Sequence, residues 1–228
     1  MMQNHFFQNR LSRWEKMWGW RYFLFQIVFL PSLLALLPAA LPRSTVNFLF
    51  FFINFTAALV IFRKFLRKLL DITGRQFLKI LGIGAVFFAL YQLSAAVVGW
   101  LYSQFLPDFF NTNDQSVAQM AGENYTLMLL GTVVLVPITE EIFYRGLVFR
   151  GLYDRSPIAA WLLSVAIFSL VHIVNYIGSC NALTLTLCFL QYIPAGFCLA
   201  AAYRLSGSIA CPTLIHAAVN AVSMLALR

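Results

Sequence analysis

The sequence YTLMLLGTVVLVPITEEIFYR, at residues 125–145, joins a long apolar run to two adjacent glutamates. A helix needs roughly 20 predominantly apolar residues to cross the hydrocarbon core of a bilayer. The apolar run begins near Tyr125 and continues through Pro137 to Glu140 and Glu141, so we expect a membrane span here. Ionisable groups inside a span are costly in free energy, and the two glutamates are therefore candidates for function.

The whole chain has the composition of an integral membrane protein. Of its 228 residues, 61% are hydrophobic and 11% are charged, whereas soluble domains have roughly 45–50% apolar and about 25% charged residues. The low charge content excludes a disordered chain and argues against a nucleic-acid partner, which requires many solvated basic side chains. The net charge of +8 is better explained by membrane topology and by contact with anionic lipid.

The apolar runs predict an all-α fold, a polytopic transmembrane helical bundle of about seven spans, with eight as the alternative. The chain then divides into residues 1–22, an N-terminal segment; residues 23–124, with spans one to three and their loops; and residues 125–228, with the remaining spans. The first run could be a signal peptide, but its length and its prolines favour a retained anchor. The spans are expected at Phe23–Leu41, Val46–Phe62, Leu78–Leu106, Tyr125–Glu141, Ile158–Ile177, Ala182–Tyr203 and Ser208–Leu227, and Pro107–Asn124 is expected to be a polar loop.

The positions of lysine and arginine predict the orientation. Ten of the first eleven basic residues lie either before the first span or between spans two and three, and Arg43 is the exception. Cytoplasmic loops of membrane proteins carry an excess of Lys and Arg. We therefore expect a multi-pass protein of the cell membrane with a cytoplasmic N-terminus, and with Arg228 on the other side.

The polar residues of the late spans fall into helical pairs. Glu141 and Arg145 are four residues apart, which places them on one helix face and suits them to an ion pair. Glu140 lies about 100° away around the same helix and points elsewhere. His216 and Asn220 are also four residues apart and can present two hydrogen-bond donors to a developing oxyanion.

Each of these features also has a structural interpretation. Glu141 with Arg145 could be a structural ion pair, and His172, in the fifth span, could form an interhelical hydrogen bond. His216 with Asn220 could likewise serve packing alone. Taken together, two carboxylates, two histidines and an amide on three late spans favour a functional site.

Three short motifs resemble the signature of the CPBP family, which contains type II CAAX prenyl endopeptidases (Ras-converting enzyme) and bacteriocin-processing or immunity homologues. The motifs are E-E-x-x-x-R from Glu140 to Arg145, F-x-x-x-H from Phe168 to His172, and H-x-x-x-N from His216 to Asn220. The resemblance covers roughly residues 125–227, so that residues 125–228 are expected to hold the catalytic helices. The family commonly has eight spans, one more than we count here.

The resemblance implies an intramembrane endopeptidase that hydrolyses membrane-associated peptides, such as bacteriocin precursors, signalling peptides or remnant signal sequences. In this interpretation Glu140 is the general base and His172 orients the attacking water. His216 and Asn220 then bind the tetrahedral oxyanion, and Glu141 and Arg145 support the site. The spacing alone does not decide which of the two glutamates is the base.

The sequence leaves one alternative open for the cofactor and two for the function. A glutamate-activated water requires no cofactor, and we favour that mechanism. The alternative is a Zn²⁺ ion held by Glu140, His172 and His216. The chain has no H-E-x-x-H zinc motif. Membrane lipid and a membrane-associated peptide are the expected partners. The alternative functions are a non-proteolytic bacteriocin-immunity or membrane scaffold protein, and an ion-coupled transporter, against which the lack of internal repeats counts.

Overall fold

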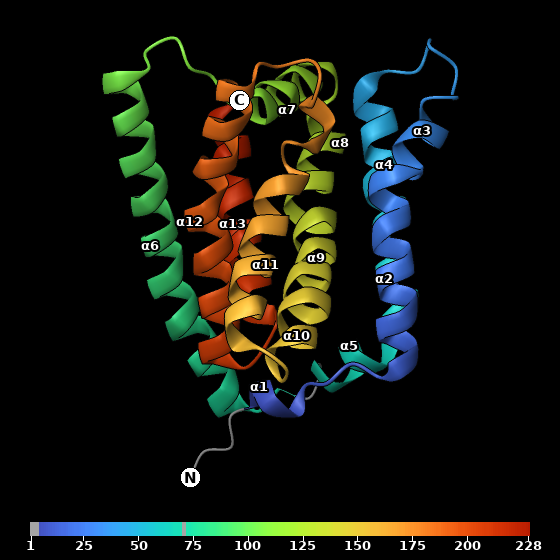
Figure 1. Ribbon diagram of the computed structural model, residues 1–228, viewed down its shortest axis with the longest axis vertical. Helices are drawn as coiled ribbons and strands as arrows, with labels where there is room; N and C mark the ends of the chain where they lie inside the picture. The colour runs from blue at the N-terminus through green and yellow to red at the C-terminus, as the bar shows by residue number, and fades with distance from the viewer. Residues whose placement is uncertain (1–4, 70–71) are drawn as a thin grey trace.

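The computed structural model describes residues 5–69 and 72–228, so that residues 1–4 of the predicted N-terminal segment lie outside it. The described residues form a bundle of helices without a β-strand (Figure 1). Short helices connect the long ones: α1 (His5–Gln8), α5 (Arg63–Leu69), α7 (Thr112–Glu123) and η3 (Val174–Tyr176). The chain runs along the bundle in α2 (Arg13–Val28) with α3 (Leu30–Leu34), α4 (Arg43–Ile61), α6 (Gly74–Phe105), the continuous helix Tyr125–Tyr153, α11 (Pro157–Val171), α12 (Ala182–Ser206) and α13 (Ala210–Ala226).

These helices confirm the all-α membrane bundle. Four of them are long and apolar enough to cross a membrane: α4, α6, the helix Tyr125–Tyr153 and α12. Two shorter apolar helices, α11 and α13, lie between and beside them. α2 and α3 follow one another along the chain and pack against α4 at the side of the bundle.

The first pass begins ten residues before the predicted span. Ser12 and Glu15 form a capping box, in which the Ser12 side chain accepts from the Glu15 amide and the Glu15 carboxylate accepts from the Ser12 amide. This cap starts the helix at Arg13 although the residues that follow include the charged side chains of Lys16 and Arg21. The helix is interrupted at Phe29, before Pro31, whose missing N–H removes one backbone hydrogen bond.

Two other expected boundaries were wrong. The fourth span does not end at Glu141, because the helix continues to Tyr153 and places Glu140 near its middle. Arg150 does not end the helix because its guanidinium is buried and donates to the carbonyls of Phe6 and Phe7. The expected loop Pro107–Asn124 contains α7, which Asn111 caps by accepting from two backbone amides.

The helices of residues 125–228 form the centre of the bundle. α6 packs against α12 and α13 on one side, whereas α2 and α4 pack on the other side against the helix Tyr125–Tyr153 (Figure 1). At the end of the bundle that holds α1, α5 and α10 (Gly151–Tyr153), aromatic side chains fill the interior. We call this cluster the aromatic floor, and its members are at most 1% exposed: Phe62, Phe65, Phe143, Phe149 and Tyr203.

Candidate active site

A cavity of about 650 Å³ is lined by Phe143 of the aromatic floor and by residues of α7 at the opposite end of the bundle. All four residues of the predicted catalytic set line it, namely Glu140, His172, His216 and Asn220. They come from three helices that are separated in sequence, α9 (Val136–Glu141), the end of α11, and α13. The structure therefore places these four side chains in the wall of one cavity.

The two adjacent glutamates have different surroundings. The side chain of Glu140 is 21% exposed and lines the cavity, whereas that of Glu141 is fully buried. Glu140 Oε2 has no hydrogen-bond partner among the described residues and lies 4.0 Å from His216 Nε2. Glu140 is thus the carboxylate of the pair that can receive a proton from a molecule in the cavity.

Glu141 is held by a buried cation. Glu141 Oε2 lies 3.1 Å from Arg145 Nε, and both side chains are fully buried, as the spacing of four residues predicts. The contact is an ion pair without the alignment of a hydrogen bond, because neither atom has a partner that meets hydrogen-bond geometry. Arg145 also donates to the Gly196 carbonyl and lies 4.6 Å above the Phe168 ring, so that its charge connects three helices.

The same Glu141 orients His216. His216 Nδ1 lies 3.0 Å from Glu141 Oε1. Because a carboxylate only accepts hydrogen bonds, this contact places a proton on Nδ1 and directs Nε2 toward Glu140. Nε2 of a neutral His216 accepts a proton, and Nε2–H of a protonated His216 donates a hydrogen bond into the cavity.

His172 is oriented by its own helix. α11 ends at Val171, and its last carbonyls lack helical partners. His172 Nδ1 lies 2.7 Å from one of them, the carbonyl of Phe168, and must therefore carry the proton. The Nε2 lone pair of His172 remains free to accept a hydrogen bond from water or substrate.

Asn220, in α13, bonds to an irregular segment of the helix that carries the glutamates. Residues Gly131–Leu135 form the π-helical segment η1, in which Val136 N–H bonds to Gly131, five residues earlier. By the same spacing the Thr132 carbonyl would need an N–H from Pro137, which has none. Asn220 Nδ2 donates a hydrogen bond to this carbonyl over 2.7 Å. The amide has a second N–H and an oxygen, Oδ1, besides the N–H used in this bond.

Two site residues escaped prediction from the sequence. The Tyr192 ring stacks on His172 at 4.2 Å between ring centroids, and its hydroxyl lies 3.2 Å from an Asp114 carboxylate oxygen. Asp114 lines the cavity. Burial raises the pKa of its carboxyl, and the hydrogen bond from Tyr192 and the nearby His172 oppose this rise only in part. The signal for Tyr192 was the polar pair Gln191–Tyr192 in the middle of the apolar helix α12.

The donor set does not fit the alternative zinc site. Within residues 5–69 and 72–228 no three His, Cys, Asp or Glu side chains are grouped so that they could hold a metal ion. The Phe168 ring packs against both histidine rings, with ring centroids 4.8 Å from that of His172 and 6.0 Å from that of His216. Glu140 and His216 approach one another, but His172 belongs to a separate position in the cavity wall.

The bundle and its cavity define a polytopic helical membrane protein in which two glutamates and a histidine lie together in the interior of the bundle. Residues 122–222, which contain all three motifs, match the family described as type II CAAX prenyl endopeptidase Rce1-like. This part of the chain is therefore similar to that family of endopeptidases, in agreement with the resemblance of the motifs. Comparison with curated proteins and with solved structures gives no match.

Proposed function

We propose that this protein cleaves membrane-associated peptides by a water molecule that Glu140 activates. The observation that supports this proposal best is the position of the Glu140 side chain, which is 21% exposed, lines the cavity and has a carboxylate oxygen, Oε2, without a hydrogen-bond partner among the described residues. A carboxylate in this position can hold a water and take its proton as the water attacks a carbonyl carbon. Glu140 Oε2 is also 4.0 Å from His216 Nε2, so a proton can pass between the two groups after small movements.

The two histidines then have different tasks. His172 presents the free Nε2 lone pair and orients the attacking water, with its ring held by Phe168 and Tyr192. His216, protonated and paired with Glu141, donates from Nε2 to the oxyanion of the tetrahedral intermediate. Transfer of the proton from Glu140 to the leaving amine completes the hydrolysis and returns Glu140 to its charged form.

The proposed reaction requires no metal, and a cleavage assay can test both points. Purified protein in lipid vesicles is mixed with a library of single-span membrane peptides, with and without a strong chelator. We expect new peptide termini in both samples at equal rates. Cleavage that stops with chelator and returns with Zn²⁺ contradicts the metal-free mechanism, and an absence of cleavage in every condition favours an immunity or scaffold role.

Asn220 bonds to the Thr132 carbonyl in addition to its proposed role at the oxyanion. Substitution of Asn220 alone and together with Pro137 distinguishes the structural role from the catalytic one. Asn220→Ala leaves the Thr132 carbonyl without a partner, which costs ~1–3 kcal/mol of stability. Pro137→Ala restores a backbone N–H beside this carbonyl. We expect the double variant to recover thermal stability in detergent without recovering cleavage.

Pro137→Ala alone is the control for this experiment, since it tests the effect of the new N–H on an intact site. Recovery of cleavage in the double variant to the level of Pro137→Ala would show that Asn220 only supports the helix. The oxyanion would then depend on His216 alone.

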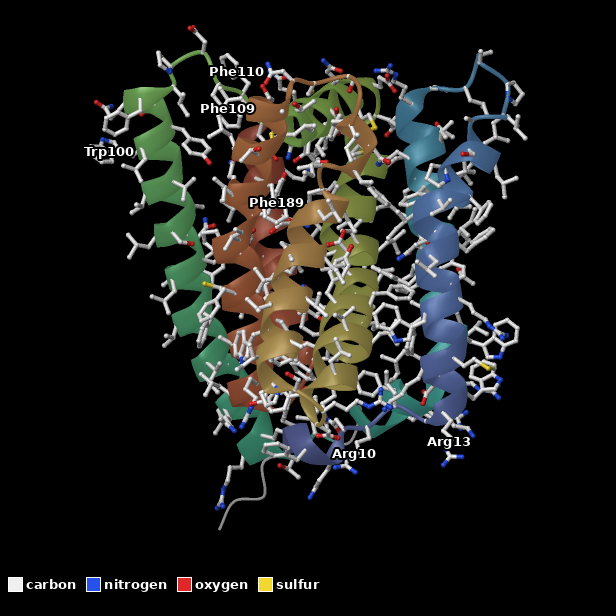
Figure 2. All side chains as sticks on the ribbon, in the orientation of Figure 1. Arg10, Arg13, Trp100, Phe109, Phe110 and Phe189 are labelled. Atoms are coloured by element: carbon white, nitrogen blue, oxygen red, sulfur yellow. The ribbon has the colours of Figure 1, made fainter. Side chains whose placement is uncertain are left out.

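The charge distribution also supports a proposed orientation in the cell membrane. α1, α5, α10 and the start of α6 lie at one end of the bundle, and the basic residues Arg10 and Arg13 project there (Figure 2). Because Lys and Arg accumulate on the cytoplasmic side, we assign this end and the N-terminus to the cytoplasm. The C-terminus and α7 then lie on the opposite side of the membrane.

A further inference from the structure

We propose that Gln26 and Asn54 form a subsite that binds the main chain of the peptide substrate beside the cleaved bond, with Tyr22 as a positioning residue. This inference rests on the proposed function for the class of its ligand, a peptide. It concerns residues of α2 and α4, which lie outside the matched segment 122–222 and outside the three motifs.

Carboxamide side chains gather in the cavity wall. Polar side chains inside a membrane span are costly in free energy unless they find hydrogen-bond partners, and they are therefore candidates for function. Among the helices that run along the bundle, the carboxamides that do not line the cavity, Gln76 and Gln104, lie close to the two ends of α6. The others all line it: Gln26, Asn47, Asn54, Gln92, Gln191 and Asn220.

Two of these amides are buried and have polar atoms without a protein partner. Gln26 is 8% exposed and forms no hydrogen bond with another described residue. Asn54 is 4% exposed, and its Oδ1 accepts from the Tyr22 hydroxyl over 2.9 Å, whereas no other described residue bonds to its Nδ2. Tyr22 thus orients Asn54 with its N–H groups free to donate, while Gln26 offers both an acceptor and donors. Because buried polar groups nearly always have a partner, these atoms require a ligand or water.

The pair lies close to Glu140, to which Phe143 connects it. α2 and α4 pack against the helix Tyr125–Tyr153, which carries the glutamates (Figure 1). The Tyr22 ring stacks on Phe143, with 6.0 Å between ring centroids and 17° between ring planes. Phe143 follows Glu140 by three residues in the same helix, and both line the cavity. A peptide whose cleaved bond lies at Glu140 can therefore extend past Phe143 to Gln26 and Asn54.

The surroundings of the two amides favour an apolar peptide as the ligand. Ile27 and Pro31 line the cavity beside Gln26, and Phe50 and Phe51 line it in the turn before Asn54. Among the described residues of the cavity wall there is no lysine or arginine. This apolar surface accommodates apolar side chains, whereas the amides match the N–H and C=O groups of a peptide bond.

Cleavage within a membrane creates a need for such partners. In a spanning helix every backbone N–H and C=O is bonded within the helix, and an unsatisfied group is costly in hydrocarbon. The helix of the substrate must unwind around the cleaved bond to admit the attacking water, and this frees neighbouring N–H and C=O groups. Gln26 and Asn54 can bind these groups whatever the adjacent side chains are. We therefore expect the subsite to select an extended main chain rather than a particular sequence.

Peptide binding to an inactive protein tests the subsite without any need for cleavage. The parent is full-length Glu140→Gln in lipid vesicles, and the probe is the fluorescent peptide that binds it most tightly within a library of single-span peptides. Gln26→Leu removes the first amide. Asn54→Leu/Tyr22→Phe removes the second amide together with its partner, so that neither group is left unpaired. Gln104→Leu is the matched control, because this amide is exposed and lies outside the cavity.

We expect Gln26→Leu and Asn54→Leu/Tyr22→Phe each to raise the Kd of the probe roughly 5–100-fold, and Gln104→Leu to leave it unchanged. Probes with a single N-methyl group, placed at each peptide bond in turn, then identify the main-chain contact. At one position N-methylation should weaken binding to the parent but have little further effect on binding to Gln26→Leu. A purely structural effect of the substitution would leave the penalty of N-methylation unchanged.

An unchanged Kd in Gln26→Leu overturns the inference, as do N-methylation penalties that are equal in the parent and in this variant. A failure of every library peptide to bind the parent overturns it as well. If Asn54→Leu/Tyr22→Phe does not fold, as its melting temperature in detergent shows, Gln26→Leu alone decides. The expected binding together with an absence of cleavage by the unmodified protein would reject the proposed function but leave the subsite established.

Discussion

Glu140→Gln is expected to lower the rate of peptide cleavage roughly 10²–10⁴-fold, the usual contribution of a general base. The substitution keeps the size of the side chain and removes the group that accepts the proton from water. Glu140 is partly exposed to the cavity, and its Oε2 has no protein hydrogen-bond partner, so the melting temperature in detergent should change little. Cleavage rates of purified protein in lipid vesicles, measured with the melting temperature, check both expectations.

Asp108→Asn is the matched control for Glu140→Gln, because it removes one carboxylate from an exposed position outside the cavity. Its cleavage rate should equal that of the unmodified protein. A Glu140→Gln variant that cleaves at the unmodified rate would exclude Glu140 as the base. Glu141 could not simply replace it, because both oxygens of Glu141 are engaged by Arg145 and His216.

Arg145→Met is expected to produce the largest loss of stability, ~3–5 kcal/mol, because it leaves the buried charge of Glu141 without its cation. The loss should be accompanied by a loss of cleavage, since Glu141 also orients His216. The double variant Glu141→Gln/Arg145→Met removes both charges and should regain a large part of the stability. Unfolding in detergent, followed for the two single variants and the double variant, measures this coupling.

The pair Arg10–Asp154 is the control for the buried ion pair. Its atoms are 3.2 Å apart, but its side chains are 66% and 40% exposed. Exposed ion pairs contribute at most ~1 kcal/mol, and Arg10→Met should therefore have a small effect. If Arg145→Met is as mild as Arg10→Met, then the charge of Glu141 is not maintained by Arg145, and the supporting role of the ion pair is wrong.

Contacts within one helix could be predicted from the sequence, whereas contacts between helices could not. The ion pair of Glu141 with Arg145 follows from helical spacing alone. The contact of His216 with Glu141 depends on how α13 is rotated against α9, which spacing within either helix does not determine. The contact of Tyr192 with His172 depends in the same way on α12 and the end of α11.

The ends of the spans were predicted less well than their centres, for a related reason. Hydropathy treats an arginine as the end of a span because a lone cation is costly in hydrocarbon. Arg145 and Arg150 are not alone, since Glu141 and the carbonyls of the N-terminal segment contact them inside the bundle. The helix can therefore continue to Tyr153, and this extension places Glu140 at the depth of the cavity.

The aromatic floor has a consequence for the membrane itself. In the reaction that we propose, water must reach Glu140, whereas Phe62, Phe143 and Phe149 fill the interior of the bundle below it. A water-filled space that ends blindly inside the bundle offers no continuous route for ions or protons between the two aqueous phases. The protein can therefore hydrolyse a bond within the bilayer while the membrane keeps its electrical resistance.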